Sequence, residues 1–397
     1  MIVIKADRMS KYAEASQARH EDQIQRILDI TDQEVMEKYG IKEEKEEVED
    51  VLYAYYNGHL DEFYIITGFN MDEFNNMFTH VEEKFTAPGR GRKPKASPRD
   101  ILIILLHYLK RYPRIEELSV VFSMKPSTLQ TIIAKYIPIM SEVMKKDFIE
   151  KAAAEKPAYD QRFPNCPYVV DATVQKICKP SLTFEFAKKY FSGKHYIYCL
   201  KSQVVVTIKG LAVSVISGIE GSVHDKRLFD NSIPELNKLF SLHPDIPHMI
   251  IGDKGYQEPD SQLLVTPYKG NSVDLTRDQL TFNQKLGEIR IIIENFFGRL
   301  KSRYEIMGST YRGCHENYAD IFTLCCALVN FEQIECDHPL RDSDQTFYVK
   351  LGASLNQEKQ QRDEKARERR KKQAKARRKR FAHVRSSSDE SSDSDSD

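Results

Sequence analysis

The sequence lacks a net charge, long apolar runs and paired cysteines, and each absence excludes a class of protein. Its 59 basic and 59 acidic side chains cancel, which argues against a chain that is basic throughout, as many obligate nucleic-acid-binding domains are. The longest apolar run, 101–106, is far shorter than the roughly 18 to 20 residues that cross a bilayer, so we expect no membrane partner. No basic segment followed by an apolar one opens the chain, so we expect no secretory signal.

The seven cysteines are odd in number and scattered, and no two form a CxxC pair. This usage is typical of reduced thiols in the cytosol or nucleus, and it favours neither a disulfide framework nor a zinc site. What the chain does contain is enough apolar material for a core: 41% hydrophobic residues, with 20 Phe and 20 Tyr among its 397 residues. That length predicts two to three domains, at about 150 residues each.

The zero net charge is a sum over unlike segments. Residues 1–86 carry 9 basic and 20 acidic side chains, whereas residues 87–140 carry 10 basic and 3 acidic ones. Residues 358–385 carry 14 basic and 4 acidic side chains, and the last twelve residues carry five acids and no base. Such segregation indicates that only some parts of the chain meet phosphate.

The acidic segment 1–86 has helical periodicity over 23–40 and 60–85. Its charge keeps it off DNA, so we interpret it as a helical cap, or as a surface for self-association or for a basic partner.

A basic arm begins the next segment. PGRGRKPK (88–95) resembles an AT-hook, in which Arg90, Arg92, Lys93 and Lys95 would follow a narrow minor groove. A plain interdomain linker is the alternative interpretation of so short a match.

Three helices are predicted after the arm. The first begins with Ser97 as N-cap and Pro98 in the first turn, buries one face, and ends at Tyr112. The second covers 115–124, and a turn at 125–126 leads into a third that starts at Ser127 or Thr128. The side chains expected to be buried are Ile101, Leu102, Leu105, Leu106, Leu109, Leu118, Val121, Phe122, Leu129, Ile132, Ile133 and Tyr136.

A tight turn before the last of three helices is typical of a helix-turn-helix. The third helix would present polar side chains to bases and phosphates, namely Ser127, Thr128, Gln130, Thr131 and Lys135. An ordinary helical bundle remains the alternative, and the neighbouring basic arm favours DNA.

From residue 167 the pattern changes to strands. Single strands are predicted at 167–177, 248–256 and 263–268, and a hairpin over 195–221 turns at Lys209-Gly210. The apolar part of 248–256 ends at Gly252-Asp253. A long helix is predicted over about 283–304, with Leu286, Ile289, Ile293, Phe297 and Leu300 on its buried face.

The second half of the chain has acidic residues in strands and at a strand end, where an unpaired carboxylate is costly to desolvate and needs a metal, a base or water as partner. Asp171 lies within a β-branched strand, Asp253 ends another, and Glu294 lies on the long helix. Mg²⁺ prefers a few carboxylates with water and phosphate oxygens, and two such ions can stabilise both oxygens of a phosphoryl displacement. For any single acid, a surface position or a salt bridge is the alternative.

The ordered motifs sharpen this hypothesis. VVDAT (169–173), SGKHYIYCLKSQVVV (192–206), GSVHDKRLFDNS (221–232), IGDKGY (251–256) and FNQKLGEIRIIIENFFGRLKSRY (282–304) together resemble the DDE superfamily endonuclease of Harbinger-type transposases and their transposase-derived relatives. The resemblance covers about 165–332. It implies an α/β protein with an RNase H-like mixed-sheet catalytic domain, preceded by an all-α helix-turn-helix region and followed by a disordered charged tail.

The resemblance also implies the residues of the site. Asp171, Asp253 and Glu294 would be catalytic and would hold Mg²⁺ or Mn²⁺, as two ions, with Asp225 as a further metal ligand or as the residue that orients a metal-bound water. Lys194, Lys201, Arg290 and Lys301 would contact phosphates, or else serve as ordinary surface charges.

The implied function is metal-dependent hydrolysis of DNA phosphodiester bonds, with strand transfer as a further step. The alternative is a domesticated DNA-binding or regulatory protein that does not cleave DNA in the cell. DNA is the expected partner, together with a second copy of the chain or a separate DNA-binding protein, which some members of this family use.

The basic run 365–380 predicts a nuclear address or a non-specific contact with DNA, and a solubilising tail is the alternative. We therefore expect the protein in the nucleus and also in the cytoplasm. The serines among the terminal acids are expected kinase sites. The expected domains are the acidic helical cap at 1–86, the arm and helix-turn-helix at 87–140, a linker at 141–164, the nuclease domain at 165–340 and the tail at 341–397.

Overall fold

The computed structural model describes residues 49–87, 95–181, 183–246, 248–256, 263–270 and 274–336. The expectations for the helix at 23–40, for Arg90, Arg92 and Lys93, and for the tail at 341–397 lie outside these residues.

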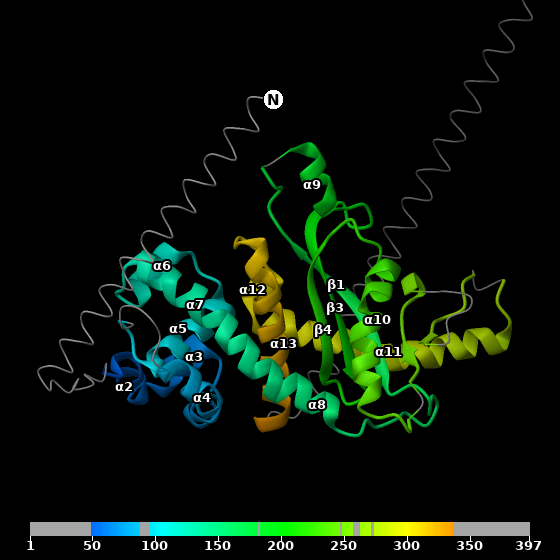
Figure 1. Cartoon of the computed structure of the whole chain (residues 1–397), viewed down its shortest axis with the longest axis horizontal. Helices are drawn as coiled ribbons and strands as arrows, with labels where there is room; N and C mark the ends of the chain where they lie inside the picture. Colours follow the sequence, from blue (N-terminus) through cyan, green and yellow to red (C-terminus); the bar gives the residue numbers. More distant parts are fainter. Residues whose placement is uncertain are drawn as a thin grey trace, which may run out of the picture. The chain divides into compact units, whose positions relative to one another are not determined.

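Helices alone make up the described chain before residue 155. They are α2 (Val51–Asn57), α3 (Leu60–Thr67), α4 (Met71–Thr86), α5 (Pro98–Arg111), α6 (Ile115–Val121) and α7 (Pro126–Met144), followed by a π-helical turn, η1 (Lys145–Glu150), and α8 (Lys151–Ala154) (Figure 1). The predicted segment 60–85 forms two helices because Gly68, at a φ of 89°, ends α3 in the left-handed conformation. Asn70 then begins α4 with a reciprocal capping box to Glu73.

Helix α5 is the centre of this helical region. Its predicted start is confirmed, since the Ser97 side chain accepts a hydrogen bond from the Asp100 backbone N–H and Pro98 occupies the first turn. The prediction of a single buried face is wrong: every residue from Asp100 to Leu109 is buried. The reason is that α5 has neighbours on several sides, namely α2, α3, α4, α7 and α12.

Helices α6 and α7 confirm the second and third predicted helices, with two differences. Val121 was expected to be buried but is 47% exposed, because α6 ends there and its packing depends on Leu118 and Phe122. Residues 141–164, expected as a linker, begin as a continuation of α7 through η1, and this stretch buries Phe148 and Ile149.

The rest of the described chain builds a mixed sheet and the helices that cover it. The strands are β1 (Tyr168–Lys176), β2 (Phe191–Ser192), β3 (Ile197–Thr207), β4 (Ala212–Glu220), β5 (Ile250–Ile251) and β6 (Leu264–Val265). The helices are α9 (Phe184–Tyr190), α10 (Asp225–Ser241), α11 (Arg277–Arg303), α12 (Glu305–Gly308) and α13 (Tyr318–Glu335), with 3-10 turns η2 (Lys254–Tyr256) and η3 (His315–Asn317). Helix α11 starts earlier than the predicted residue 283, because Thr276 and Gln279 form a capping box.

The strand order is β2-β3-β1-β5-β6, with β4 also paired to β3. The predicted hairpin is confirmed: β3 and β4 are antiparallel, and Gly210 in their turn has a φ of 80°. Strand β1 is antiparallel to β3 and parallel to β5, so it lies inside the sheet with hydrogen-bonded neighbours on both edges.

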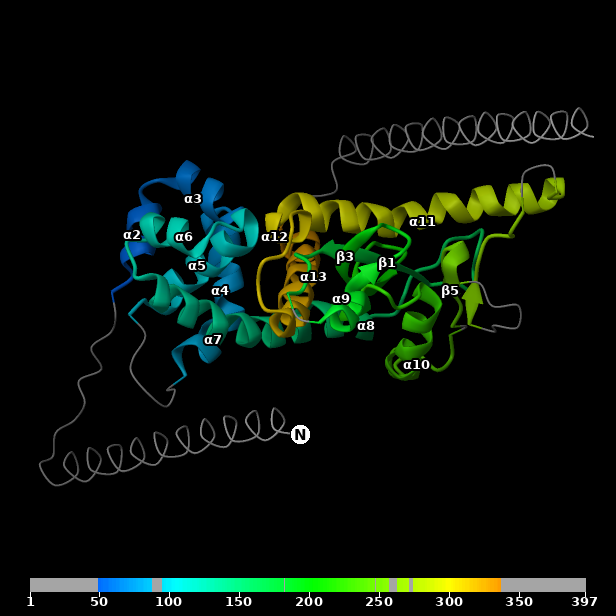
Figure 2. The ribbon, with the colours of Figure 1, turned by 90° about the horizontal axis from the view of Figure 1, so that it is seen from above.

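Successive residues of β1 enter two different cores, because side chains of a strand alternate between its faces. Val169 belongs to the cluster that contains α11 and α13, whereas Tyr168 and Val170 belong to the cluster that contains α10. Figure 2 shows α11 along one side of the sheet and α10 along the other. The sheet is therefore a middle layer between helices.

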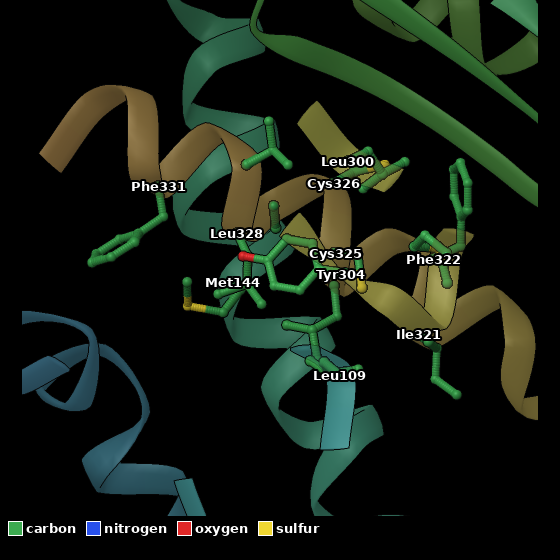
Figure 3. Packing of buried hydrophobic residues seen from close by; sticks show 14 of the residues in the cluster. Leu109, Met144, Leu300, Tyr304, Ile321, Phe322, Cys325, Cys326, Leu328 and Phe331 are labelled. Carbon is green, nitrogen blue, oxygen red and sulfur yellow. The ribbon is translucent and has the colours of Figure 1, made fainter. Parts of the chain in front are cut away.

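One core joins the helical region to the sheet region. In Figure 3, Leu109 of α5 and Met144 of α7 pack with Tyr304 and with side chains of α13 such as Ile321 and Leu328. The Tyr304 hydroxyl, at the end of α11, donates to Glu332 of α13 at 2.8 Å. Among the described helices, none combines the length and the apolar character needed to cross a bilayer.

Candidate active site

Asp171 and Asp253 lie side by side because their strands are in parallel register. Val169 of β1 is paired with Ile251 of β5, and each aspartate follows two residues after its member of that pair. Residues two apart in an extended chain point to the same face, so both carboxylates lie on the face of Val169 and Ile251. Those two side chains belong to the core that also contains α11, so the aspartates face α11.

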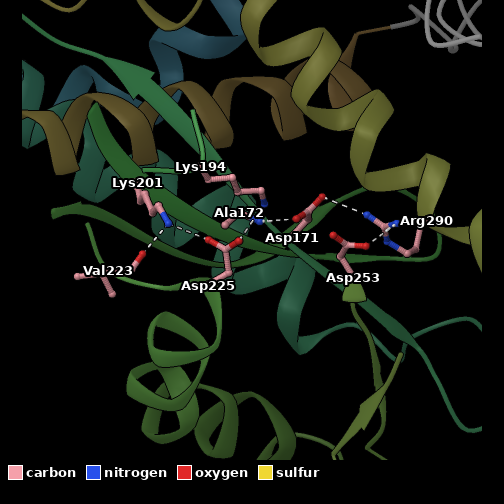
Figure 4. Close-up of polar contacts among 8 residues, drawn as sticks. All are labelled: Asp171, Ala172, Lys194, Lys201, Val223, Asp225, Asp253 and Arg290. Carbon is pink, nitrogen blue, oxygen red and sulfur yellow. Dashed lines mark hydrogen bonds and ion pairs between the residues drawn. The ribbon is translucent and has the colours of Figure 1, made fainter. Parts of the chain in front are cut away.

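Helix α11 brings Arg290 and Glu294 to the same place. Ile289 and Ile293 are buried against the sheet, which positions the adjacent Arg290 and, one turn later, Glu294 at the edge of the packed stripe. Figure 4 shows the Arg290 guanidinium reaching toward Asp171 and Asp253.

Arg290 pairs with all three predicted catalytic acids. Its Nη2 is 3.4 Å from Asp171 Oδ2 and 3.8 Å from Glu294 Oε1, and its Nη1 is 3.3 Å from Asp253 Oδ1. Its Nε is buried without a hydrogen-bond partner. The sequence assigned Arg290 to a phosphate contact, but the structure places it between the acids. One positive charge thus faces three carboxylates.

The pKa of Asp171 is raised to about 6. Burial is the largest cause, and the neighbouring Asp253 and Glu294 carboxylates add to it. The Arg290 charge and a hydrogen bond from the Ala172 backbone N–H act in the opposite direction but do not outweigh burial. Ionisation of Asp171 therefore destabilises the folded protein.

Asp225 is satisfied by different partners. It is the first residue of α10, and its Oδ1 accepts from Lys201 at 2.9 Å while its Oδ2 accepts from Lys194 at 3.2 Å (Figure 4). Burial raises its pKa, but the hydrogen bonds and charges of Lys201 and Lys194 outweigh burial and hold the pKa below its usual range. Asp225 forms a second, charge-compensated group beside the first.

The turn after Asp253 connects the two groups. Gly255 lies so close to Asp225 that a Cβ there would be 3.5 Å from Asp225 Oδ2. The next residue, Tyr256, is buried, and its hydroxyl has no hydrogen-bond partner. This tyrosine ends the IGDKGY motif, and no sequence signal distinguished it from an ordinary core residue.

The remaining predicted phosphate contacts differ in exposure. Lys194 is mostly exposed, whereas Lys201 is buried and also donates to the Val223 carbonyl. Lys301 is half-buried, and burial lowers its pKa. Lys201 is thus engaged inside the protein and cannot serve as a surface contact.

The donor set at Asp171, Asp253 and Glu294 fits a hard divalent cation. It offers carboxylate oxygens only, and its charge exceeds what Arg290 compensates. Within the described residues, no three or more His, Cys, Asp or Glu side chains are arranged to hold a metal ion. In this arrangement the acids surround Arg290 instead.

The side chains predicted to read DNA lie on the outer face of α7. Ser127, Gln130, Thr131 and Lys135 are exposed and Thr128 is half-buried, whereas Leu129, Ile132 and Tyr136 are buried. Ile133 is half-buried, and Lys95, the described residue of the basic arm, is exposed. The polar face of α7 is accessible to a partner.

Two comparisons with known proteins bear on this geometry. Residues 170–330 match the family described as DDE superfamily endonuclease. The chain is also 26% identical over 273 residues to a probable transposase for insertion sequence element IS702 from Microchaete diplosiphon, an alignment that covers 67% of this chain and 92% of that relative. The matched region begins in β1 beside Asp171 and includes Asp253 and Glu294. The resemblance to DDE superfamily endonucleases that the motifs indicated is therefore confirmed for residues 170–330.

Proposed function

We propose that this protein is a metal-dependent DNA endonuclease of the DDE transposase type, with an RNase H-like catalytic domain. The observation that carries the proposal is the convergence of Asp171, Asp253 and Glu294, from two parallel neighbouring strands and a facing helix, on one guanidinium. Among the described residues, Arg290 is the one cation paired with these three carboxylates, so the site has a deficit of positive charge, as a cation-binding phosphoryl-transfer site requires.

The acids would hold Mg²⁺ or Mn²⁺, as two ions. When bound, the cations supply Lewis-acid activation of a water or a 3′-hydroxyl and neutralise charge on the leaving oxygen. Asp171, on a strand inside the sheet, would be a ligand shared by the cations, and Asp253 and Glu294 would each contribute a further carboxylate.

The protein's other groups have supporting roles. Asp225, fixed by Lys201 and Lys194, orients a water at the edge of the site. Lys194 and Lys301 contact the phosphates that flank the scissile bond, and Arg290 offers its Nη groups to phosphate oxygens as the acids engage cations. No covalent intermediate with the protein is needed, because water or a 3′-hydroxyl is the nucleophile.

DNA binding is assigned to the helical region. The exposed polar face of α7, with Gln130, Thr131 and Lys135, would enter the major groove, and the basic arm would follow the minor groove. The run 365–380, outside the described residues, would direct the protein to the nucleus.

A plasmid nicking assay tests the catalytic assignment. With Mg²⁺ or Mn²⁺, the wild-type chain should nick supercoiled plasmid, and Asp253→Asn should reduce the rate by at least about a hundredfold while DNA binding is kept. Asp230→Asn is the matched control, since Asp230 is a half-exposed α10 aspartate that pairs with Lys226. Equal rates for Asp253→Asn and wild type would refute the site. DNA binding without cleavage by the wild-type chain would instead support the non-cleaving DNA-binding protein.

A further inference from the structure

The turn between β2 and β3 contains a tyrosine in an unfavourable backbone conformation. Tyr196 has a φ of 57°, in the left-handed region that bulky side chains rarely adopt. Its backbone N–H donates to the Ser192 carbonyl at 2.8 Å, which closes the turn between the two strands. A left-handed position in a turn usually carries glycine or asparagine. A tyrosine therefore costs stability here, and strained residues of this kind are concentrated at functional sites.

The Tyr196 side chain is open to solvent. It is 81% exposed, and it makes no hydrogen bond and no ring contact with another residue of the described chain. Neither burial nor a local contact therefore explains an aromatic residue at this position. Phe184, the first residue of α9, is a second exposed ring of the same segment, at 72%. Both rings are available to a planar partner.

The segment that contains both rings is basic. Residues 176–198 include five lysines and a single acid, Glu185. The five lysines are all exposed, namely Lys176, Lys179, Lys188, Lys189 and Lys194. As far as the described residues show, Lys194 alone of the five has a carboxylate partner. Exposed lysines beside exposed aromatic rings are typical of a surface that binds a single nucleic-acid strand.

Backbone pairing gathers this segment at one end of the sheet. Helix α9 leads directly into β2, whose Ser192 is paired with Ile197 of β3. On the other edge of β3, Lys176 at the end of β1 is paired with Cys199. Figure 1 shows α9 beyond the same end of β1 and β3. The lysines and the rings of residues 176–198 therefore belong to one surface, the α9 surface.

Two contacts connect the α9 surface to the candidate active site. Lys194 lies in the β2–β3 turn, two residues before Tyr196, and its Nζ is 3.2 Å from Asp225 Oδ2 (Figure 4). The backbone N–H of Ser222, three residues before Asp225, donates to the Lys189 carbonyl of α9 at 3.0 Å. DNA held by the acids therefore has the α9 surface within reach.

We propose that Tyr196 stacks on an unpaired nucleobase of the DNA substrate, while the lysines of the α9 surface contact the phosphates of the same strand. Bases inside a duplex are stacked on both faces, so a single exposed ring binds only a base that has left the stack. The protein therefore prefers DNA with unpaired bases near the cut. This inference rests on the proposed function, because it identifies the bound strand with the DNA that the acids cleave.

Binding of the full chain to two duplexes of the same sequence tests the contact. One duplex is fully paired, and the other has unpaired adenines at its centre, one of them replaced by 2-aminopurine, whose fluorescence falls when it stacks. In EDTA, which prevents cleavage, wild type should bind the second duplex at least about fivefold more tightly and quench its fluorescence. Tyr196→Asn should lose both effects and bind the paired duplex as wild type does. Tyr196→Phe keeps the ring and should keep both effects.

The asparagine variant separates stacking from folding, because asparagine tolerates a positive φ. Its Tm should equal that of wild type or exceed it by up to about 2 °C. Tyr55→Asn is the matched control, since Tyr55 is a 51% exposed tyrosine of α2, and it should keep the preference of wild type.

The inference is overturned if Tyr196→Asn keeps the preference for unpaired bases and the quenching. It is also overturned if wild type binds both duplexes equally, a result that would favour a protein partner for the exposed ring. The preference needs no cation, so it is measured separately from cleavage. A wild-type chain that shows the preference but does not nick plasmid with Mg²⁺ or Mn²⁺ would refute the proposed function and not the stacking contact.

Discussion

One arginine compensates three carboxylates at the candidate site, and this imbalance has consequences that can be measured on single residues. Burial raises the pKa of the Asp171 carboxyl group to about 6. An ionised carboxylate in a buried site lowers the free energy of unfolding, and such destabilising groups are common at functional sites.

Asp171→Asn should therefore stabilise the metal-free protein at neutral pH while it abolishes cleavage. The folded-state pKa is raised above the unfolded value of 3.8, so wild-type stability falls as pH rises from about 3.8 to 6 and is constant above that. The variant, which cannot ionise, should be more stable by about 2 kcal/mol at pH 7.5 in EDTA and equal to wild type near pH 4. Urea unfolding at both pH values is the measurement. A variant that is less stable at pH 7.5 would contradict the charge imbalance.

Lys201 and Lys194 pair with the same carboxylate, but only the first is buried. Lys201→Met should cost about 3 kcal/mol, because it leaves Asp225 and the Val223 carbonyl without their buried partner. Lys194→Met should cost less than about 1 kcal/mol, since its side chain is 63% exposed and its pair is screened by water. Chemical denaturation in EDTA compares the two, and equal losses would show that burial does not decide the strength of this pair.

The sequence motifs located the acids but not their partners. Asp171, Asp253 and Glu294 were selected because the motifs that contain them resemble those of DDE endonucleases, and the structure brings their side chains together around Arg290. Arg290 and Lys201 were interpreted as phosphate contacts, since nothing in linear spacing reveals that a helix turns Arg290 toward two strands. Tyr256 was missed for the same reason: the state of its hydroxyl depends on the packing of α10 and β1 around it.

Among the elements, helix α2 shows how a distant residue can create a helix start. Asp50, its N-cap, makes no side-chain capping bond, and the Asp100 carboxylate of α5 accepts from the backbone N–H groups of Leu52 and Tyr53 instead. Because the cap is 47 or 48 residues away in sequence, local signals did not predict this helix. Asp100 is itself 2% exposed in the first turn of α5, so one carboxylate serves two helix starts.

Asp100→Ala should destabilise the protein by about 2 kcal/mol, since two backbone donors of α2 lose their acceptor. Asp100→Asn keeps one acceptor oxygen, and about half of that loss is expected. Hydrogen exchange of Leu52 and Tyr53 should accelerate in the alanine variant before that of α5 does. Uniform acceleration over both helices would argue that Asp100 supports packing and not the α2 start.

Helix α13 marks the limit of periodicity as a guide. Nearly all of its residues from Ile321 to Phe331 are buried, and it packs against α7, η1, β4 and α11. A helix that is surrounded on several sides has no polar stripe, so its sequence shows no helical period. Helix α7 was predictable from its solvent face and the strands from their β-branched pattern. Helix α5 is also buried on several sides, but its Ser97-Pro98 start marked it in the sequence, whereas α13 offers neither signal.

On the scale of the molecule, the helical region and the sheet region are joined by polar contacts as well as by one core. Arg312, after α12, stacks over the Tyr112 ring at 4.1 Å, and its backbone N–H is hydrogen-bonded to the Tyr112 hydroxyl at 2.6 Å. Ser141 of α7 donates to the Asp320 carbonyl of α13 at 3.0 Å. These contacts connect α7, the proposed DNA-reading helix, to α13, which packs against β4 of the sheet.

Asn330 is the strongest of these connections. It is completely buried in α13, its side-chain amide donates to the Phe148 carbonyl of η1 and to the Ala212 carbonyl of β4, both at 2.7 Å, and its Oδ1 accepts from the Ala212 N–H at 2.9 Å. It thereby satisfies backbone groups of both regions at once. An apolar residue at this position would leave all three backbone groups buried and unpaired.

Asn330→Leu should therefore destabilise both regions together, by about 3 to 4 kcal/mol, whereas Ser141→Ala, which removes one hydrogen bond, should cost about 1 kcal/mol. Because the core is continuous from α3 to α13, we expect far-ultraviolet circular dichroism and tyrosine fluorescence to report the same urea midpoint in wild type and in both variants. If the unfolding curve of Asn330→Leu instead shows two transitions, with the helical region unfolding separately from the sheet, then Asn330 and not the shared core couples the two regions. Coincident transitions would mean that the two regions unfold as one unit. If DNA binds α7 as proposed, it should then stabilise the sheet region as well, which thermal unfolding with and without DNA measures.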